Sequence, residues 1–114
     1  MNHVNDVFIG VDLGGTNVRV GAITPLGDML TWQAAEIEAS RGPEAGVKKI
    51  SALVQRVATS SDGSIRGIGI GAPGPLDRQH GTIQNPYTLP GWERVDIVSQ
   101  IANQFGVPVA LEND

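Results

Sequence analysis

The sequence predicts an α/β domain, a mixed five-stranded sheet with helices packed on it, in the order βββαβαβ. Three observations predict this fold class. Strand-like segments over residues 7–12, 17–24 and 29–37 are joined by short turns, two segments with helical spacing follow, and an apolar segment of strand length comes after each of these. Short turns favour an antiparallel meander, whereas helical crossovers imply parallel pairing of the later strands.

The first helix is expected to begin at Pro43, because proline is favoured at the first helical position, and to end near Ser60. The second is expected over residues 93–105, where Gly106 caps it and Pro108 prevents its continuation. Both segments carry one apolar stripe, formed by Val47, Ile50, Leu53, Val54 and Val57 in the first and by Val95, Val98, Ile101, Ala102 and Phe105 in the second.

The later strands are expected over residues 65–72, which alternate strictly, and over residues 107–111. Between them the chain is rich in proline and glycine from residue 73 to residue 92. We expect this stretch to be irregular, with short strand pairs around Leu76 and Ile83.

The composition is that of an ordinary soluble domain: 114 residues, of which 40% are hydrophobic and 18% charged. The formal net charge is −4 and there is no basic stripe, so nucleic acid is not an expected partner. There is no cysteine, hence no disulfide and no thiolate zinc site in these residues. No apolar run reaches the length of a membrane span, and the first residues lack a signal-peptide pattern, so we expect a cytoplasmic protein without a membrane partner.

Residues 69–74 match the G-x-G-x-x-G pattern of dinucleotide sites. That pattern requires a helix to open within it, but Pro73 and Pro75 flank the last glycine and no helical periodicity follows. We therefore expect no dinucleotide site here. Two interpretations remain: a strand whose glycine face lets another backbone pack closely, and a loop whose glycines let a ligand approach main-chain amides.

The stretch Asp12-Leu13-Gly14-Gly15-Thr16-Asn17 lies between two strands. Its glycines allow main-chain amides to face an anion, Thr16 and Asn17 add hydrogen-bond donors, and Asp12 is a candidate ligand for a hydrated Mg²⁺ on nucleotide phosphates. The alternative is a plain hairpin turn, in which Asp12 and Asn17 satisfy the local backbone.

The residues Glu112-Asn113-Asp114 follow the last predicted strand. Ligands of parallel sheets bind beyond the carboxyl ends of the strands, where a carboxylate can take a proton from a hydroxyl and an amide can orient that hydroxyl. The alternative is three polar residues without a role. The histidines His3 and His80 are expected to be exposed and without partners.

Taken together, these segments resemble the ROK family of bacterial sugar kinases and sugar-responsive repressors, within the actin-like ATPase (ribonuclease H-like) superfamily. The resemblance covers almost the whole chain. The matching segments occur in the family's order and are Asp12-Leu13-Gly14-Gly15-Thr16, residues 67–74, Asp77, Gly81, Leu89-Pro90-Gly91-Trp92, Pro108-Val109 and Glu112-Asn113-Asp114.

The resemblance implies a glucokinase-like enzyme that uses ATP and Mg²⁺ to phosphorylate a hexose or N-acetylhexosamine, at C6 for glucose-like substrates. It implies that Asp114 is the catalytic base and Asn113 a ligand of the sugar hydroxyl. It also implies that Gly74 and Pro75 contact the sugar and that the phosphates are bound by Asp12, Gly14, Gly15 and Thr16. Asn17 is a further candidate for phosphate binding, which we add from its position beside this turn. Thr88 stands where the family often has asparagine, which leaves the sugar open, and Asn85 is a candidate to compensate.

The resemblance also implies that residues 1–114 form a single domain, the N-terminal lobe of a two-lobe kinase. Further sugar contacts, the Cys/His zinc site and most of the adenosine pocket would belong to a C-terminal lobe that this chain lacks, so we expect the lobe alone to be inactive. An apolar face without its partner lobe makes a homo-oligomer a candidate assembly.

Two other functions compete with the kinase. A sugar-sensing repressor of the same family would carry a helix-turn-helix before the phosphate motif, and the roughly ten residues before Asp12 are too few for one. A non-catalytic interaction fragment would tolerate the loss of site residues. This argues against such a fragment, because the chain retains Asp12, Gly14, Gly15, Thr16 and Asp114.

Overall fold

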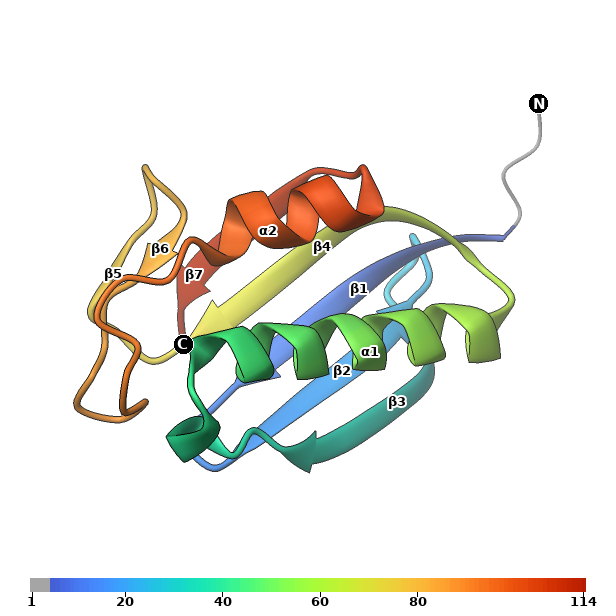
Figure 1. The fold of residues 1–114 in the computed structure, drawn as a ribbon. Coiled ribbons are helices and arrows are strands. Elements are labelled where there is room, and N and C mark those ends of the chain that lie inside the picture. The colour runs from blue at the N-terminus through green and yellow to red at the C-terminus, as the bar shows by residue number, and fades with distance from the viewer. Residues whose placement is uncertain (1–4) are drawn as a thin grey trace.

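A computed structural model describes residues 5–114 and has the predicted five-stranded mixed sheet (Figure 1). The strands lie in the order β3-β2-β1-β4-β7. An antiparallel meander is formed by β1 (Asp6–Leu13), β2 (Asn17–Ile23) and β3 (Met29–Glu36). On the other side of β1, β4 (Ser64–Ala72) pairs with β1 in parallel and β7 (Val109–Asn113) pairs with β4 in parallel. The carboxyl ends of β1, β4 and β7 therefore lie at one edge of the sheet.

Both α-helices, α1 (Pro43–Ser61) and α2 (Ile97–Phe105), cover the same face of this sheet (Figure 1). The strand residues on that face are apolar and buried: Val7, Ile9, Val11, Leu13, Val18, Val20, Ala22, Ile68, Ile70 and Leu111. A short 3₁₀ turn, η1 (Ala39–Arg41), precedes α1. As predicted, Pro43 is the first helical residue of α1, which ends one residue later than expected. Neither α-helix of the described chain has the length and hydrophobicity that crossing a bilayer requires.

The predicted start of the second helix at residue 93 was wrong, since α2 begins at Ile97 after the cap residue Asp96. The cause is a contact that is distant in sequence. Val95 forms an isolated antiparallel bridge with Ile83, in which each residue donates its N–H to the other's carbonyl at 2.9 Å. Backbone groups committed to that bridge are not free to start a helix.

The predicted limits of the last strand were also wrong, since β7 spans residues 109–113 instead of 107–111. Glu112 pairs with Gly71, and Asn113 pairs with Ala72. Polar side chains are compatible with this end of the strand because Glu112 lies on the uncovered face of the sheet. Of the residues taken to follow the strand, Glu112 and Asn113 thus belong to it and Asp114 comes directly after it.

Residues 73–96 form a cap at the carboxyl ends of β4 and β7 (Figure 1). It contains the two short strands that were predicted, β5 (Leu76–Asp77) and β6 (Thr82–Ile83). Leu89 and Trp92 are fully buried and anchor the cap in the hydrophobic core. A further cap contact corrects the expectation for His80, which is exposed but has a partner: its Nδ1 lies 2.7 Å from Oδ2 of Asp77. His3 lies outside the described residues.

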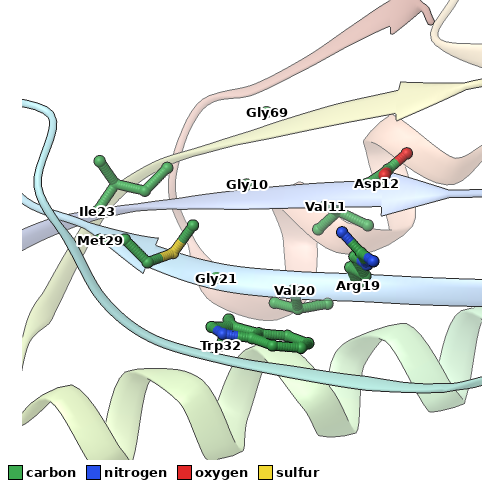
Figure 2. A pocket seen from close by; sticks show the side chains of 10 residues that line it. All are labelled: Gly10, Val11, Asp12, Arg19, Val20, Gly21, Ile23, Met29, Trp32 and Gly69. Carbon is green, nitrogen blue, oxygen red and sulfur yellow. The ribbon is translucent and has the colours of Figure 1, made fainter.

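The face of the sheet opposite the helices is open and hollowed (Figure 2). Gly21, Gly10 and Gly69 lie side by side on β2, β1 and β4, and the missing side chains contribute to a hollow of about 560 Å³. Ile23 and Met29 lie at one end of the hollow, and Asp12 and Arg19 project at the other (Figure 2). Residues 69–71 thus belong to a strand with a glycine face, as expected, but the close packing of another backbone against that face is not found among the described residues, since a Cβ on Gly69 would meet nothing within 4 Å.

Candidate functional site

The candidate site lies at the edge where β1, β4 and β7 end. Asp12 on β1 is level with Gly71 on β4, which is level with Glu112 on β7. Asp114 follows two residues after Glu112, and its N–H donates to the carbonyl of Ala72 at 3.0 Å. Asp12 and Asp114 thus approach the end of β4 from its two sides, and both are exposed. The sheet brings together two carboxylates that are about a hundred residues apart in sequence.

Residues 14–16 form the turn between β1 and β2, as the hairpin interpretation predicts. The N–H of Gly14 donates to the carbonyl of Asn17 at 2.9 Å, and the carbonyl of Thr16 accepts from the N–H of Ile37 at 2.9 Å. Among the described residues, no group accepts a hydrogen bond from the amides of Gly15 and Thr16. A turn with two such amides at a strand end has donors for an anion, so the hairpin and the anion-binding interpretation are compatible.

Gly15 is held against the cap. A Cβ built on Gly15 would lie 2.6 Å from Cγ2 of Thr88 and 3.0 Å from its carbonyl oxygen. These distances are shorter than ordinary van der Waals contacts, so no side chain fits at this position. The turn that carries the free amides is therefore in contact with the loop that contains Thr88.

Gly74 contacts the end of β7 in a similar way. Its N–H donates to Oδ1 of Asn113 at 3.3 Å, and a Cβ at this glycine would lie 2.6 Å from Nδ2 of the same side chain. No helix opens after it, as predicted, because β5 begins at Leu76. The structure therefore places Gly74, Asn113 and Asp114 next to one another.

A metal ion at this edge would be shared with a ligand. Within residues 5–114 no three His, Cys, Asp or Glu side chains are grouped so that they could hold a metal. Mg²⁺ is commonly bound through one or two carboxylates together with substrate phosphates and waters. Asp12, exposed at the end of β1, fits that role and does not provide a metal site by itself.

The sequence profile of the ROK family matches residues 8–114. The chain belongs to the ROK family. A glucokinase from Thermotoga maritima is 32% identical over 107 residues, which are 94% of this chain and 33% of the glucokinase. A xylose repressor from Caldicellulosiruptor bescii is 26% identical over 110 residues, covering 94% of this chain and 27% of the repressor.

Solved ROK structures share the fold. The ROK hexokinase from Thermus thermophilus aligns with a TM-score of 0.85 at 28% identity, over 94% of this chain and 35% of the hexokinase. The ROK glucokinase from Streptomyces griseus, in complex with glucose and AMPPNP, aligns with a TM-score of 0.80 at 27% identity, over 94% of this chain and 33% of the glucokinase. The fold is thus the actin-like ATPase fold that was predicted, and the chain spans about a third of the length of these relatives.

One expectation about the site was wrong. Asn85 does not offer its side chain to a sugar in place of Thr88, because it is fully buried. Its Nδ2 donates to the carbonyl of Pro73 at 3.2 Å, and its Oδ1 accepts from the N–H groups of Tyr87 and Thr88 at 3.1 and 3.0 Å. Sequence reasoning missed this internal role, for which the only local signal is an asparagine followed by proline and turn residues.

Proposed function

We propose that this chain is the N-terminal lobe of an ATP-dependent hexose kinase and that it supplies the phosphate-binding turn, part of the sugar site and the catalytic base. The observation that carries the proposal is the meeting of three segments at one sheet edge: the turn with free amides, the Gly74 loop and the end of β7. The similarity to glucokinases and ROK hexokinases supports the same reaction.

In this proposal Asp114 is the base. Its carboxylate takes the proton of the acceptor hydroxyl, at C6 of a glucose-like sugar, while the hydroxyl oxygen bonds to the γ-phosphorus and the bond to the β-phosphate oxygen breaks. The bond from the Asp114 N–H to the carbonyl of Ala72 holds the backbone of Asp114 against the sheet. Because phosphoryl transfer depends on positioning and charge neutralisation, a rigid strand end is a suitable place for this group.

The phosphates of ATP would be bound by the amides of Gly15 and Thr16 with the hydroxyl of Thr16, and Asn17 adds an amide side chain at the start of β2. Asp12 would hold the hydrated Mg²⁺, which neutralises charge on the transferring phosphate when bound. Gly14 closes the turn through its bond to Asn17. We assign the sugar to the part of this sheet edge that is formed by Asn113, Gly74 and Pro75.

The experiment that tests the proposal compares Asp114→Asn with Glu112→Gln in the full-length protein. Loss of a general base lowers kcat by a factor of roughly 10² to 10⁴ while the sugar still binds. Glu112 is a matched control, because its carboxylate lies only two residues before Asp114, at the end of β7, and forms an ion pair with Arg78 at 3.1 Å. Asp114→Asn with unchanged kcat in a hexose phosphorylation assay would remove Asp114 from the base role.

The similarity to a xylose repressor makes a sugar-sensing repressor the second candidate. Both functions require a sugar site, so sugar binding does not separate them. ATP-dependent phosphate transfer to hexoses and N-acetylhexosamines does: a protein that binds one of these sugars without transferring phosphate to it supports the repressor. We expect the 114-residue chain alone to show no turnover, because it spans only about a third of the related kinases.

A further inference from the structure

Asn85 lies at the centre of the cap and is fully buried, which is unusual for an asparagine. It is held by four hydrogen bonds besides the donor bond to Pro73. Its own N–H donates to the carbonyl of Trp92 at 2.9 Å and its carbonyl accepts from the N–H of Leu89 at 3.2 Å, while its Oδ1 accepts from two amides. The side chain therefore has a donor on one side and an acceptor on the other, and a hydrophobic residue of the same size would satisfy neither.

On one side, Asn85 fixes the loop proposed to contact the sugar. Its Nδ2 donates to the carbonyl of Pro73, and the next residue, Gly74, donates its N–H to Oδ1 of Asn113. The position of the Asn113 side chain thus depends on a loop that Asn85 holds from inside the cap.

On the other side, Asn85 fixes the loop that touches the phosphate-binding turn. Its Oδ1 accepts from the N–H of Thr88, and the methyl group and carbonyl of Thr88 lie where a side chain on Gly15 would have to stand. One buried side chain therefore connects the sugar loop to the turn with free amides.

We propose that Asn85 is a positioning residue that fixes the sugar-binding loop at Pro73–Pro75 and the phosphate-binding turn at Gly15 relative to each other. This inference rests on the proposed kinase function. Asn85 is too deeply buried to touch either substrate, so it acts through Pro73 and Thr88. The distance between the acceptor hydroxyl and the γ-phosphate then depends on its side chain.

The deciding variant is Asn85→Asp in the full-length protein. An aspartate of the same size keeps both acceptor bonds from the Tyr87 and Thr88 amides, but an ionised carboxylate oxygen replaces the donor that faces the Pro73 carbonyl. Protonation of the carboxyl restores a donor. We expect the KM for the hexose to rise by about tenfold or more at neutral pH, with a smaller rise in the KM for ATP.

The pH dependence separates positioning from mere stability. The ratio of hexose KM between Asn85→Asp and the wild type should fall toward one as the pH is lowered through the pKa of the new carboxyl, at a temperature where both proteins are folded. Asn103→Asp is the matched control, because Asn103 is exposed on α2, and it should leave the ratio at one throughout.

Each outcome has one interpretation. If the wild type phosphorylates a hexose and Asn85→Asp shows an unchanged KM, or a raised KM whose ratio does not change with pH, the positioning role is refuted and the kinase function stands. If the wild type phosphorylates no hexose, the proposed function fails and the inference fails with it. If Asn85→Asp does not fold, Asn85→Ser, which is smaller and keeps a donor and an acceptor, must raise the hexose KM or the role is refuted.

Discussion

Substitution of Gly15 by alanine tests whether the phosphate-binding turn and the cap act as one unit. The new Cβ would lie 2.6 Å from Cγ2 of Thr88 and 3.0 Å from the Thr88 carbonyl oxygen. An ordinary carbon–carbon contact of about 3.5 Å requires a movement of roughly 1 Å. Overpacking of this kind costs about 1–3 kcal/mol. If the whole cost weakens substrate binding, the affinity falls by about 5- to 150-fold.

Steady-state kinetics with ATP and hexose varied in turn measure this effect. We expect Gly15→Ala to raise the KM for both substrates, because the displaced Thr88 is tied through Asn85 to the sugar loop. Thr88→Ser removes Cγ2, the nearer of the two clashing atoms. The double variant Gly15→Ala/Thr88→Ser should therefore have lower KM values than Gly15→Ala alone, and the single variant Thr88→Ser should have KM values close to those of the wild type. A Gly15→Ala protein with an unchanged hexose KM, or no recovery in the double variant, would refute the coupling.

Three further predictions concern stability and ionisation. Gly46→Ala in α1 should destabilise the protein by about 1–3 kcal/mol in urea unfolding, because the new Cβ would lie 2.6 Å from the buried ring of Trp92. Alanine is the better helix former, so a stabilised variant would show that the Trp92 ring moves away without cost. Ser51→Ala should leave the free energy of unfolding unchanged or raise it by up to about 1 kcal/mol, because Oγ of Ser51 is buried without a partner among the described residues. A large fall in the free energy of unfolding would contradict this and show that the hydroxyl has a hydrogen-bond partner. The side-chain and backbone hydrogen bonds from His80 lower the pKa of Asp77, so any contribution of this pair to stability is present above the unfolded-state pKa and is lost as the pH falls through the lowered one. NMR titration should place the Asp77 midpoint below its ordinary value, and His80→Ala should raise it part of the way back, because the backbone N–H of residue 80 still donates to Oδ1 of Asp77.

The strands and helices were predictable from local pattern where one face is buried. Alternation identified β4, and Pro43 identified the start of α1. The start of α2 was not predictable in this way, because Val95 has the spacing of a helical stripe but its backbone pairs with Ile83. A contact between residues twelve positions apart is not visible in a window of one helix.

The sequence predicted the site residues at the sheet edge, Asp12 and Asp114, but not the buried residue between the two loops, Asn85. The motifs of Asp12 and Asp114 point to the edge of the sheet because each adjoins a strand, and parallel strands bring such ends together. Asn85 has no comparable motif. The turn-forming tendency of asparagine predicts its bonds to the amides of Tyr87 and Thr88, but its burial and its bond to Pro73 depend on how the whole cap folds.

The glycines of the G-x-G-x-x-G match lie in two different environments. A Cβ on Gly69 would meet nothing within 4 Å, and one on Gly71 would make only ordinary contacts, so among the described residues neither glycine is required by packing. Gly74 is different, because a Cβ there would lie 2.6 Å from Asn113. The first two belong to an open sheet face and the third to the candidate sugar site. Substitution of Gly74 by alanine should therefore displace the Asn113 side chain at the candidate sugar site, whereas alanine at Gly69 would meet no neighbouring atom among the described residues.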